Sequence, residues 1–247
     1  VAATGGSGAS PTASNASIKQ GDNYFFNSNY TTLEWTGELV RKQINPVTAE
    51  ASTAVDWSAQ AKLDSKPWAS RAIWTFDNSV AVTKLRAFNT ANFATNSYFL
   101  SPHISTAPNG LTQYLCASAT ICLSPTDQDD SHAAGANLVN YLRGDRTNGG
   151  GETDNNKYYR QRTHVLGDLV NAQVVYVNKP QYNYADIGYT AYIASQATRI
   201  ATLYAGANDG MLHAFRAKGS AATELLVEAA ATAVNAAQLD QSNAALA

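Results

Sequence analysis

The stretch from residue 200 to residue 215 constrains the fold of this chain more than any other. It reads Ile-Ala-Thr-Leu-Tyr-Ala-Gly, then Ala-Asn-Asp-Gly, then Met-Leu-His-Ala-Phe. Apolar and aromatic residues on both sides of an Asp-Gly pair are typical of two antiparallel strands joined by a tight turn. Asn208, Asp209 and Gly210 are residue types that tolerate the positive φ angles of such turns. The sequence therefore predicts a β-hairpin with these three residues in its turn.

Further stretches predict more strands and few helices. Residues 33–50 alternate apolar and polar positions and then reach Asn45-Pro46, which predicts a hairpin that turns at this pair. Residues 70–76 and 165–177 are rich in β-branched and aromatic residues and predict strands, the second bent at Gly167. Residues 133–143 have helical spacing and predict a short helix. The expected fold class is mainly β, with a β-rich segment that carries short helices.

Composition excludes some classes of function. The 17 Lys and Arg residues stand against 19 Asp and Glu residues without forming a basic cluster, so we do not expect a nucleic-acid partner. No run of about 18 apolar residues is present, so we expect no membrane span. The first 17 residues lack the basic start and apolar run of an export signal, and we expect such a signal to lie upstream or to have been removed.

The two cysteines, Cys116 and Cys122, close a short loop. Loops of this kind are often bridged in oxidising compartments, so a disulfide is predicted, with two buried free thiols as the alternative. A metal site is not expected, because no second cysteine pair or nearby histidine pair completes a tetrahedral set of ligands.

Several strings in this sequence resemble one family in the same order along the chain. They are Leu138-Val-Asn-Tyr-Leu-Arg-Gly-Asp-Arg146, His164-Val-Leu-Gly-Asp-Leu-Val-Asn171 and Leu203-Tyr-Ala-Gly-Ala-Asn-Asp-Gly-Met-Leu-His-Ala-Phe215. They are similar to the amino-acid sequence at the start of the β-propeller in the PilC/PilY family of type IV pilus tip adhesins. The chain departs from this text at residues 172–174 and in its alanine-rich tail from residue 221 onward.

The resemblance implies a domain organisation. Residues 1–17 are a linker of small residues, residues 18–132 form the β-rich segment that leads into the propeller, and residues 133–247 form the start of a quinoprotein-like β-propeller that remains incomplete. A closed propeller needs roughly 4–8 four-stranded blades, more than this length allows. The family's calcium loop lies in a later part of the propeller, so no residue of this chain is assigned to calcium and no cofactor is expected in this segment.

The resemblance also implies a function. It predicts a pilus tip-associated adhesin and assembly factor that supports pilus biogenesis, surface attachment and twitching motility. Its partners would be minor pilins of the pilus tip complex and a host or abiotic surface. Its place would be extracellular, at the pilus tip or outer cell surface, reached through the periplasm.

Two motifs invite a role in binding. Arg143-Gly144-Asp145 is the tripeptide that integrins recognise, which makes these residues a candidate receptor contact. Such tripeptides recur by chance, and the alternative is that Asp145 caps the chain locally or pairs with Arg143 or Arg146. A group of four tyrosines between residues 182 and 192 suits a contact surface, but we expect it to pack onto the blade.

Two other functions compete with the adhesin. The hairpin text also resembles the repeated blades of quinone-dependent dehydrogenases, but it occurs once here and the cysteines are not adjacent. The chain has no nucleophile elbow and no His-Glu-x-x-His pair, so we do not expect an enzyme. The other alternative is a non-adhesive structural subunit packed in a filament, which predicts strand edges covered by another chain.

Overall fold

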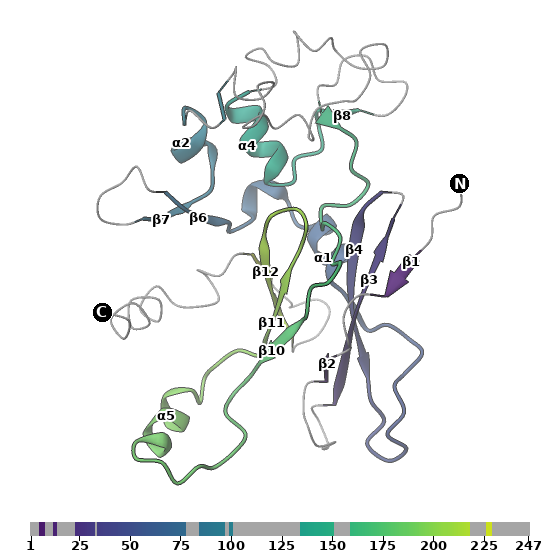
Figure 1. Ribbon diagram of the computed structural model, residues 1–247, viewed down its shortest axis with the longest axis vertical. Helices are drawn as coiled ribbons and strands as arrows, with labels where there is room; N and C mark the ends of the chain where they lie inside the picture. The colour runs from purple at the N-terminus through teal and green to yellow at the C-terminus, as the bar shows by residue number, and fades with distance from the viewer. Residues whose placement is uncertain are drawn as a thin grey trace. The chain divides into compact units, whose positions relative to one another are not determined.

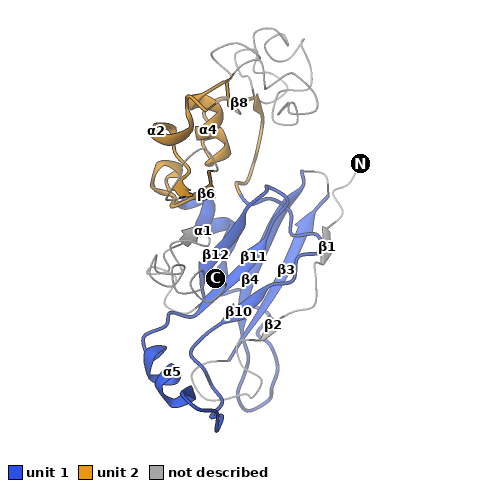
Figure 2. Ribbon diagram, turned by 60° about the vertical axis from the view of Figure 1, so that its left-hand side comes forward, with its two compact units in different colours: residues 1–65, 166–247 blue, residues 66–165 orange. Residues whose placement is uncertain are grey.

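The computed structural model describes residues 23–32, 34–77, 84–96, 99–100, 134–150 and 159–217, together with three short strands at 5–7, 12–13 and 226–228 (Figure 1). The chain divides into two compact units. Unit 1 contains residues 1–65 and 166–247, and unit 2 contains residues 66–165, as Figure 2 shows in blue and orange. The two units are groups of residues that contact one another in space. They do not test the domain boundaries predicted at residues 17 and 132, which stay predictions.

The first sheet of unit 1 is built around a long antiparallel pair. Strand β3 (Tyr24–Thr31) pairs with β4 (Thr36–Gln43) along its whole length, and β4 also pairs with β5 (Trp57–Ser58). Strands β1 (Gly5–Ser7) and β2 (Thr12–Ala13) both pair with β3. Helix α1 (Ala59–Ser65) follows β5 and buries Leu63.

The hairpin predicted for residues 33–50 is therefore only partly right. Its first arm is β4, but the longer partner of β4 is β3, which precedes it. The Asn45-Pro46 turn does reverse the chain, because Ile44 bridges Ala51 and the chain then enters β5. The polar residues of β3 conceal its strand character from a search for alternating apolar positions.

The second sheet of unit 1 is a four-stranded antiparallel meander. Its order is β10 (Val175–Val177), β11 (Thr202–Gly206), β12 (Leu212–Arg216) and β13 (Leu226–Glu228). Every pair is antiparallel and each strand lies beside the next one in sequence. A four-stranded meander is the repeating unit of a β-propeller. The strand predicted for 165–177 is shorter than expected, because only β10 belongs to this sheet.

Aromatic pairs and one arginine hold the two sheets of unit 1 together. Phe26 of β3 stacks on Tyr176 of β10 with ring centroids 5.6 Å apart, and Trp57 of β5 meets Phe215 of β12 edge-on at 5.6 Å. The buried Arg41 of β4 donates a hydrogen bond from Nη1 to the carbonyl of Ala217, just beyond β12, at 2.6 Å. The core of unit 1 therefore lies between the two sheets.

Unit 2 contains short elements around one helix. They are the 3-10 helix η1 (Trp68–Ser70), strands β6 (Trp74–Phe76) and β7 (Leu85–Ala87), helices α2 (Thr90–Phe93) and α4 (Ala136–Leu142), and strands β8 (Gly149–Gly150) and β9 (Tyr159–Arg160). Leu138 and Tyr141 of α4 are buried against Tyr159, with the two tyrosine rings stacked 4.4 Å apart. The helix predicted for 133–143 is thus present as α4.

The predicted fold class is confirmed. The chain is mainly β with a few short helices, and its second sheet has the topology of a propeller blade. Between β10 and β11 the chain leaves the blade as a long excursion that carries helix α5 (Tyr189–Ser195), which Figure 1 shows in green beyond the ends of the strands.

Candidate functional site

The predicted hairpin turn lies between β11 and β12. The backbone N–H of Gly210 donates to the carbonyl of Ala207 at 3.1 Å, and the N–H of Ala207 donates to the carbonyl of Met211 at 3.0 Å. Gly210 has a φ of 83°, in the left-handed region that glycine enters without a steric penalty. Asn208 and Asp209 do not have positive φ, so of the three predicted turn residues only Gly210 serves for its backbone freedom.

Asp209 serves instead as a buried hydrogen-bond acceptor. Its Oδ2 accepts the N–H of Gly167 at 3.1 Å and lies 2.9 Å from Nε2 of His213, while its Oδ1 accepts the N–H of Met211 at 3.0 Å. Burial by itself would raise the pKa of Asp209, but the charge and hydrogen bond of His213, followed by the two backbone N–H groups, hold that pKa below its ordinary value. Asp209 is therefore an ionised carboxylate at neutral pH.

The segment at residues 166–168 is fixed to this carboxylate. Asn208 donates from its backbone N–H to the carbonyl of Asp168 at 3.0 Å, and its side-chain amide donates to the Asp168 carboxylate. A Cβ atom on Gly167 would lie 2.6 Å from the backbone nitrogen of Asp209, which is closer than any side chain allows. Glycine is therefore required at 167 by close approach of two backbones. We call Gly167, Asp168, Asn208, Asp209 and His213 the blade clasp.

The blade clasp also reaches the first sheet of unit 1. Thr36 of β4 forms an isolated antiparallel bridge with Gly167, and the N–H of Gly37 donates to the carbonyl of Leu166 at 3.2 Å. The segment that carries Gly167 is thus bonded to β4 on one side and to the β11–β12 turn on the other. Spacing in the sequence did not reveal this arrangement, since Gly167 and Asp209 are 42 positions apart.

The residues of the blade clasp stabilise the fold. His213 is 1% exposed and lies parallel to the ring of Phe215, at 5.8 Å between centroids. Its Nε2 is occupied by Asp209, so the imidazole is closed to a substrate. Within the described residues, no group of three His, Cys, Asp or Glu side chains is arranged to hold a metal ion.

The Arg-Gly-Asp tripeptide occupies the C-terminal end of α4 in unit 2. Arg143 is 6% exposed, and its guanidinium donates to the carbonyls of Trp68, Ala69 and Arg71 at 3.3, 3.2 and 2.9 Å, as well as to that of Phe88. Gly144 has a φ of 109°. These contacts make Arg143 a buried anchor for the surrounding loops.

Asp145 has a local capping role of the kind that the sequence left open. Its Oδ1 accepts the backbone N–H of Thr147 at 2.9 Å and the Thr147 hydroxyl at 2.6 Å. An integrin-type contact needs the arginine and the aspartate exposed together, whereas here the guanidinium is enclosed. The geometry therefore favours the structural interpretation of the tripeptide.

Three of the four tyrosines between β10 and β11 are exposed and Tyr189 is half-buried, so the expectation that they pack onto the blade is wrong. Tyr182, Tyr184 and Tyr192 are 60%, 55% and 42% exposed, and α5 has no buried residue. Their rings form a contiguous row with centroids 5–6 Å apart, at 6.1, 5.1 and 5.7 Å from Tyr182 through Tyr184 and Tyr189 to Tyr192. Tyrosines are exposed here because the excursion extends past the strand ends, where neither sheet covers it.

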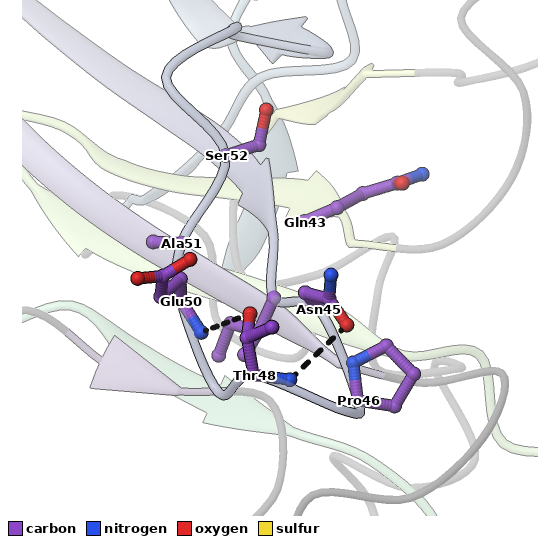
Figure 3. Close-up of a pocket in the computed structure, with 8 residues that line it drawn as sticks. Gln43, Asn45, Pro46, Thr48, Glu50, Ala51 and Ser52 are labelled. Carbon is purple, nitrogen blue, oxygen red and sulfur yellow. Dashed lines mark hydrogen bonds between the residues drawn. The ribbon is translucent and has the colours of Figure 1, made fainter.

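A shallow hollow of about 460 Å³ lies in the loop after β4 (Figure 3). Asn45 shapes it, since its Oδ1 accepts the N–H groups of Val47 and Thr48 at 2.8 and 3.3 Å. The hollow is lined by side chains that hydrogen bonds of the turn itself keep in place, and residues 45–50 are all exposed. The hollow therefore encloses no side chain that could take part in a reaction.

Cys116 and Cys122 lie outside the described residues, so the disulfide stays a prediction. Among the residues described, no helix is long and apolar enough to cross a membrane.

Comparison with known proteins gives a consistent result. Residues 166–242 match the PilY1 beta-propeller domain family. The chain is 44% identical over 92 residues to a type IV pilus biogenesis factor PilY1 homolog of Xylella fastidiosa, which covers 34% of this chain and 7% of that protein. It is 27% identical over 205 residues to PilY1 of Pseudomonas aeruginosa strain UCBPP-PA14, which covers 79% of this chain and 15% of that protein.

The chain thus spans between 7% and 15% of the length of these relatives. No solved structure matches it. The family match begins at Leu166 and includes the whole blade clasp together with strands β10 to β13. Residues 166–242, which contain the blade, therefore belong to the PilY1 beta-propeller family.

Proposed function

We propose that this chain is part of a type IV pilus biogenesis factor that acts at the cell surface without an active site. The observation that carries the proposal is the alignment of 79% of the chain with a protein of that name, together with a family match that coincides with the blade. Its finer parts are attachment to host or abiotic surfaces, support of twitching motility, and contact with minor pilins at the pilus tip.

The blade clasp supports a non-enzymatic role. Its histidine, His213, and one of its two aspartates, Asp209, are hydrogen-bonded to each other, and both are largely buried. In a dehydrogenase of the quinoprotein type, polar side chains would have to face a cofactor rather than one another. The polar residues of the blade clasp hydrogen-bond within the blade and so stabilise its fold. A blade of this kind is suited to a scaffold that presents a surface.

The proposal is tested by deleting the gene in the bacterium that encodes this chain. We expect surface pili, sheared from the cells and measured by immunoblot, to fall strongly, and the full-length wild-type gene to restore them. Unchanged piliation and attachment in the deletion strain would refute the role in biogenesis. Attachment counted per piliated cell separates adhesion from assembly.

A second measurement addresses catalysis. We expect the purified full-length protein to reduce no artificial electron acceptor when supplied with alcohols or aldose sugars and a quinone cofactor. Dye reduction that exceeds that of a heat-denatured sample would favour the dehydrogenase instead.

A further inference from the structure

The excursion between β10 and β11 exposes an aromatic surface that the blade does not use. We call Tyr182, Tyr184, Tyr189 and Tyr192 with Asp186 the tyrosine row. Its rings touch one another in tilted and edge-on pairs, and three of the four are more than two-fifths exposed. Ile187, which follows Asp186, is fully exposed. Contiguous exposed apolar groups of this kind mark interaction sites.

The intrinsic stability of a short helix does not account for helix α5 in the excursion. Helix α5 has seven residues and buries none of them, whereas isolated helices shorter than about 12–15 residues are marginal in water. The excursion also carries the tyrosines away from both sheets, beyond the ends of β10 and β11 (Figure 1). A partner that packs on the face of the blade would therefore leave the tyrosine row uncovered.

Charge indicates what the surface binds. Asp186 is the only charged residue among residues 180–198, and it is exposed. Partial desolvation, followed by the nearby Tyr184, Tyr192 and Asp186, raises the pKa of Tyr189 above its ordinary value, which is consistent with Asp186 lying near this side chain. Aromatic faces carry partial negative charge and attract cations, and a carboxylate beside them adds to the attraction.

The excursion already holds one cation by this chemistry. The guanidinium of Arg199 lies 5.9 Å from the centroid of the Tyr192 ring, and its Nη2 lies 3.4 Å from the Tyr192 hydroxyl. Its Nη1 donates to the carbonyl of Asn178 at 3.2 Å, which keeps it at the base of the excursion. Tyr182, Tyr184 and Asp186 are exposed.

We infer that the tyrosine row is a docking surface for a protein segment that presents lysine or arginine side chains among apolar ones. Exposed tyrosines supply large, rigid contact area at low entropic cost, and the depletion of charge around them is typical of the centre of a protein interface. Asp186 supplies the complement to the partner's cation. This inference stands on the geometry of the excursion and does not depend on the pilus role.

Immobilised repeat peptides test the inference by biolayer interferometry with the whole chain. The probes are Gly-Ser-Lys and Gly-Ser-Arg repeats, compared with Gly-Ser-Leu and Gly-Ser-Glu repeats of equal length. We expect the chain to bind the two cationic probes and to bind neither of the others. Equal binding to the leucine repeat would show a merely sticky apolar surface, and no binding to the cationic probes would equally overturn the inference.

Variants locate the binding. Because each exposed cation–aromatic contact is worth roughly 0.5–1 kcal/mol, Tyr184→Ser with Tyr189→Ser is expected to weaken binding about fivefold or more. Asp186→Asn is expected to weaken it about twofold to fivefold. Glu50→Gln is the matched control, since it removes one exposed carboxylate of the same sign in another loop. Equal loss in Glu50→Gln and Asp186→Asn would mean non-specific attraction and would contradict the assignment. Circular dichroism that matches the wild type confirms folding.

Discussion

Removal of the Asp209 carboxylate is the sharpest test of the blade clasp. In Asp209→Ala, the N–H groups of Gly167 and Met211 and the imidazole of His213 all lose their acceptor. A hydrogen bond to a charged group is worth about 1.5–3 kcal/mol. Two backbone bonds at the lower value give about 3 kcal/mol. Asp209 is 14% exposed, so water replaces part of what is lost, while His213 adds a further unpaired group. We expect the free energy of unfolding to fall by about 3 kcal/mol.

Urea unfolding and hydrogen exchange measure the effect together. The midpoint of urea unfolding reports the free energy, and exchange of the Gly167 amide reports the clasp itself. We expect that amide to exchange faster in Asp209→Ala, while amides of α4 in unit 2 keep wild-type rates. A change in the free energy of unfolding below about 0.5 kcal/mol, the usual range for surface substitutions, would refute the reasoning.

The same carboxylate predicts a dependence on pH. Its pKa is lower in the folded chain than the ordinary value of about 4. The stability that it contributes is therefore fully present above pH about 4 and is lost as the pH falls through the folded-state pKa. Asp209→Asn should lack this part of the acid transition. An acid unfolding curve for Asp209→Asn that parallels the wild type from pH 5 downward would contradict this assignment.

Three further predictions concern the scaffold. Gly37→Ala should lower the free energy of unfolding by roughly 1–3 kcal/mol in urea titrations, because its Cβ would lie 2.2 Å from the carbonyl oxygen of Gly167, and a neutral result would contradict the close approach. Arg143→Met should cost about 3 kcal/mol in the same assay, since it strips donors from four carbonyls, whereas a stable variant that only loses cell attachment would favour the receptor role. Ala49→Gly should raise the thermal midpoint slightly, because Ala49 has a φ of 61° and relief of a left-handed residue, about 1–2 kcal/mol, exceeds the entropy that glycine costs.

Local chemistry explains what could be predicted from the sequence. The hairpin of β11 and β12 follows from short strands beside an Asp-Gly pair, and α4 follows from apolar residues at helical spacing. Both depend on residues a few positions apart. The family resemblance, which implies the propeller, likewise rests on contiguous strings of residues.

The candidate sites required contacts between distant residues. Periodicity did not reveal β3, because its central residues are polar and its strand form depends on pairing with β4. Asp209 looked like a turn residue, and its role as an acceptor for Gly167 appears only when the two segments meet. The tyrosines looked like packing residues, since composition cannot say whether a neighbouring surface covers them.

Residue patterns alone predicted a mainly β chain, a hairpin at residues 200–215, and a resemblance to type IV pilus proteins. The burial of Arg143, the close approach of Gly167 to Asp209 and the exposure of the tyrosine row became evident from the three-dimensional contacts. Turn and strand preferences act between neighbouring residues, whereas burial depends on which remote segments pack together.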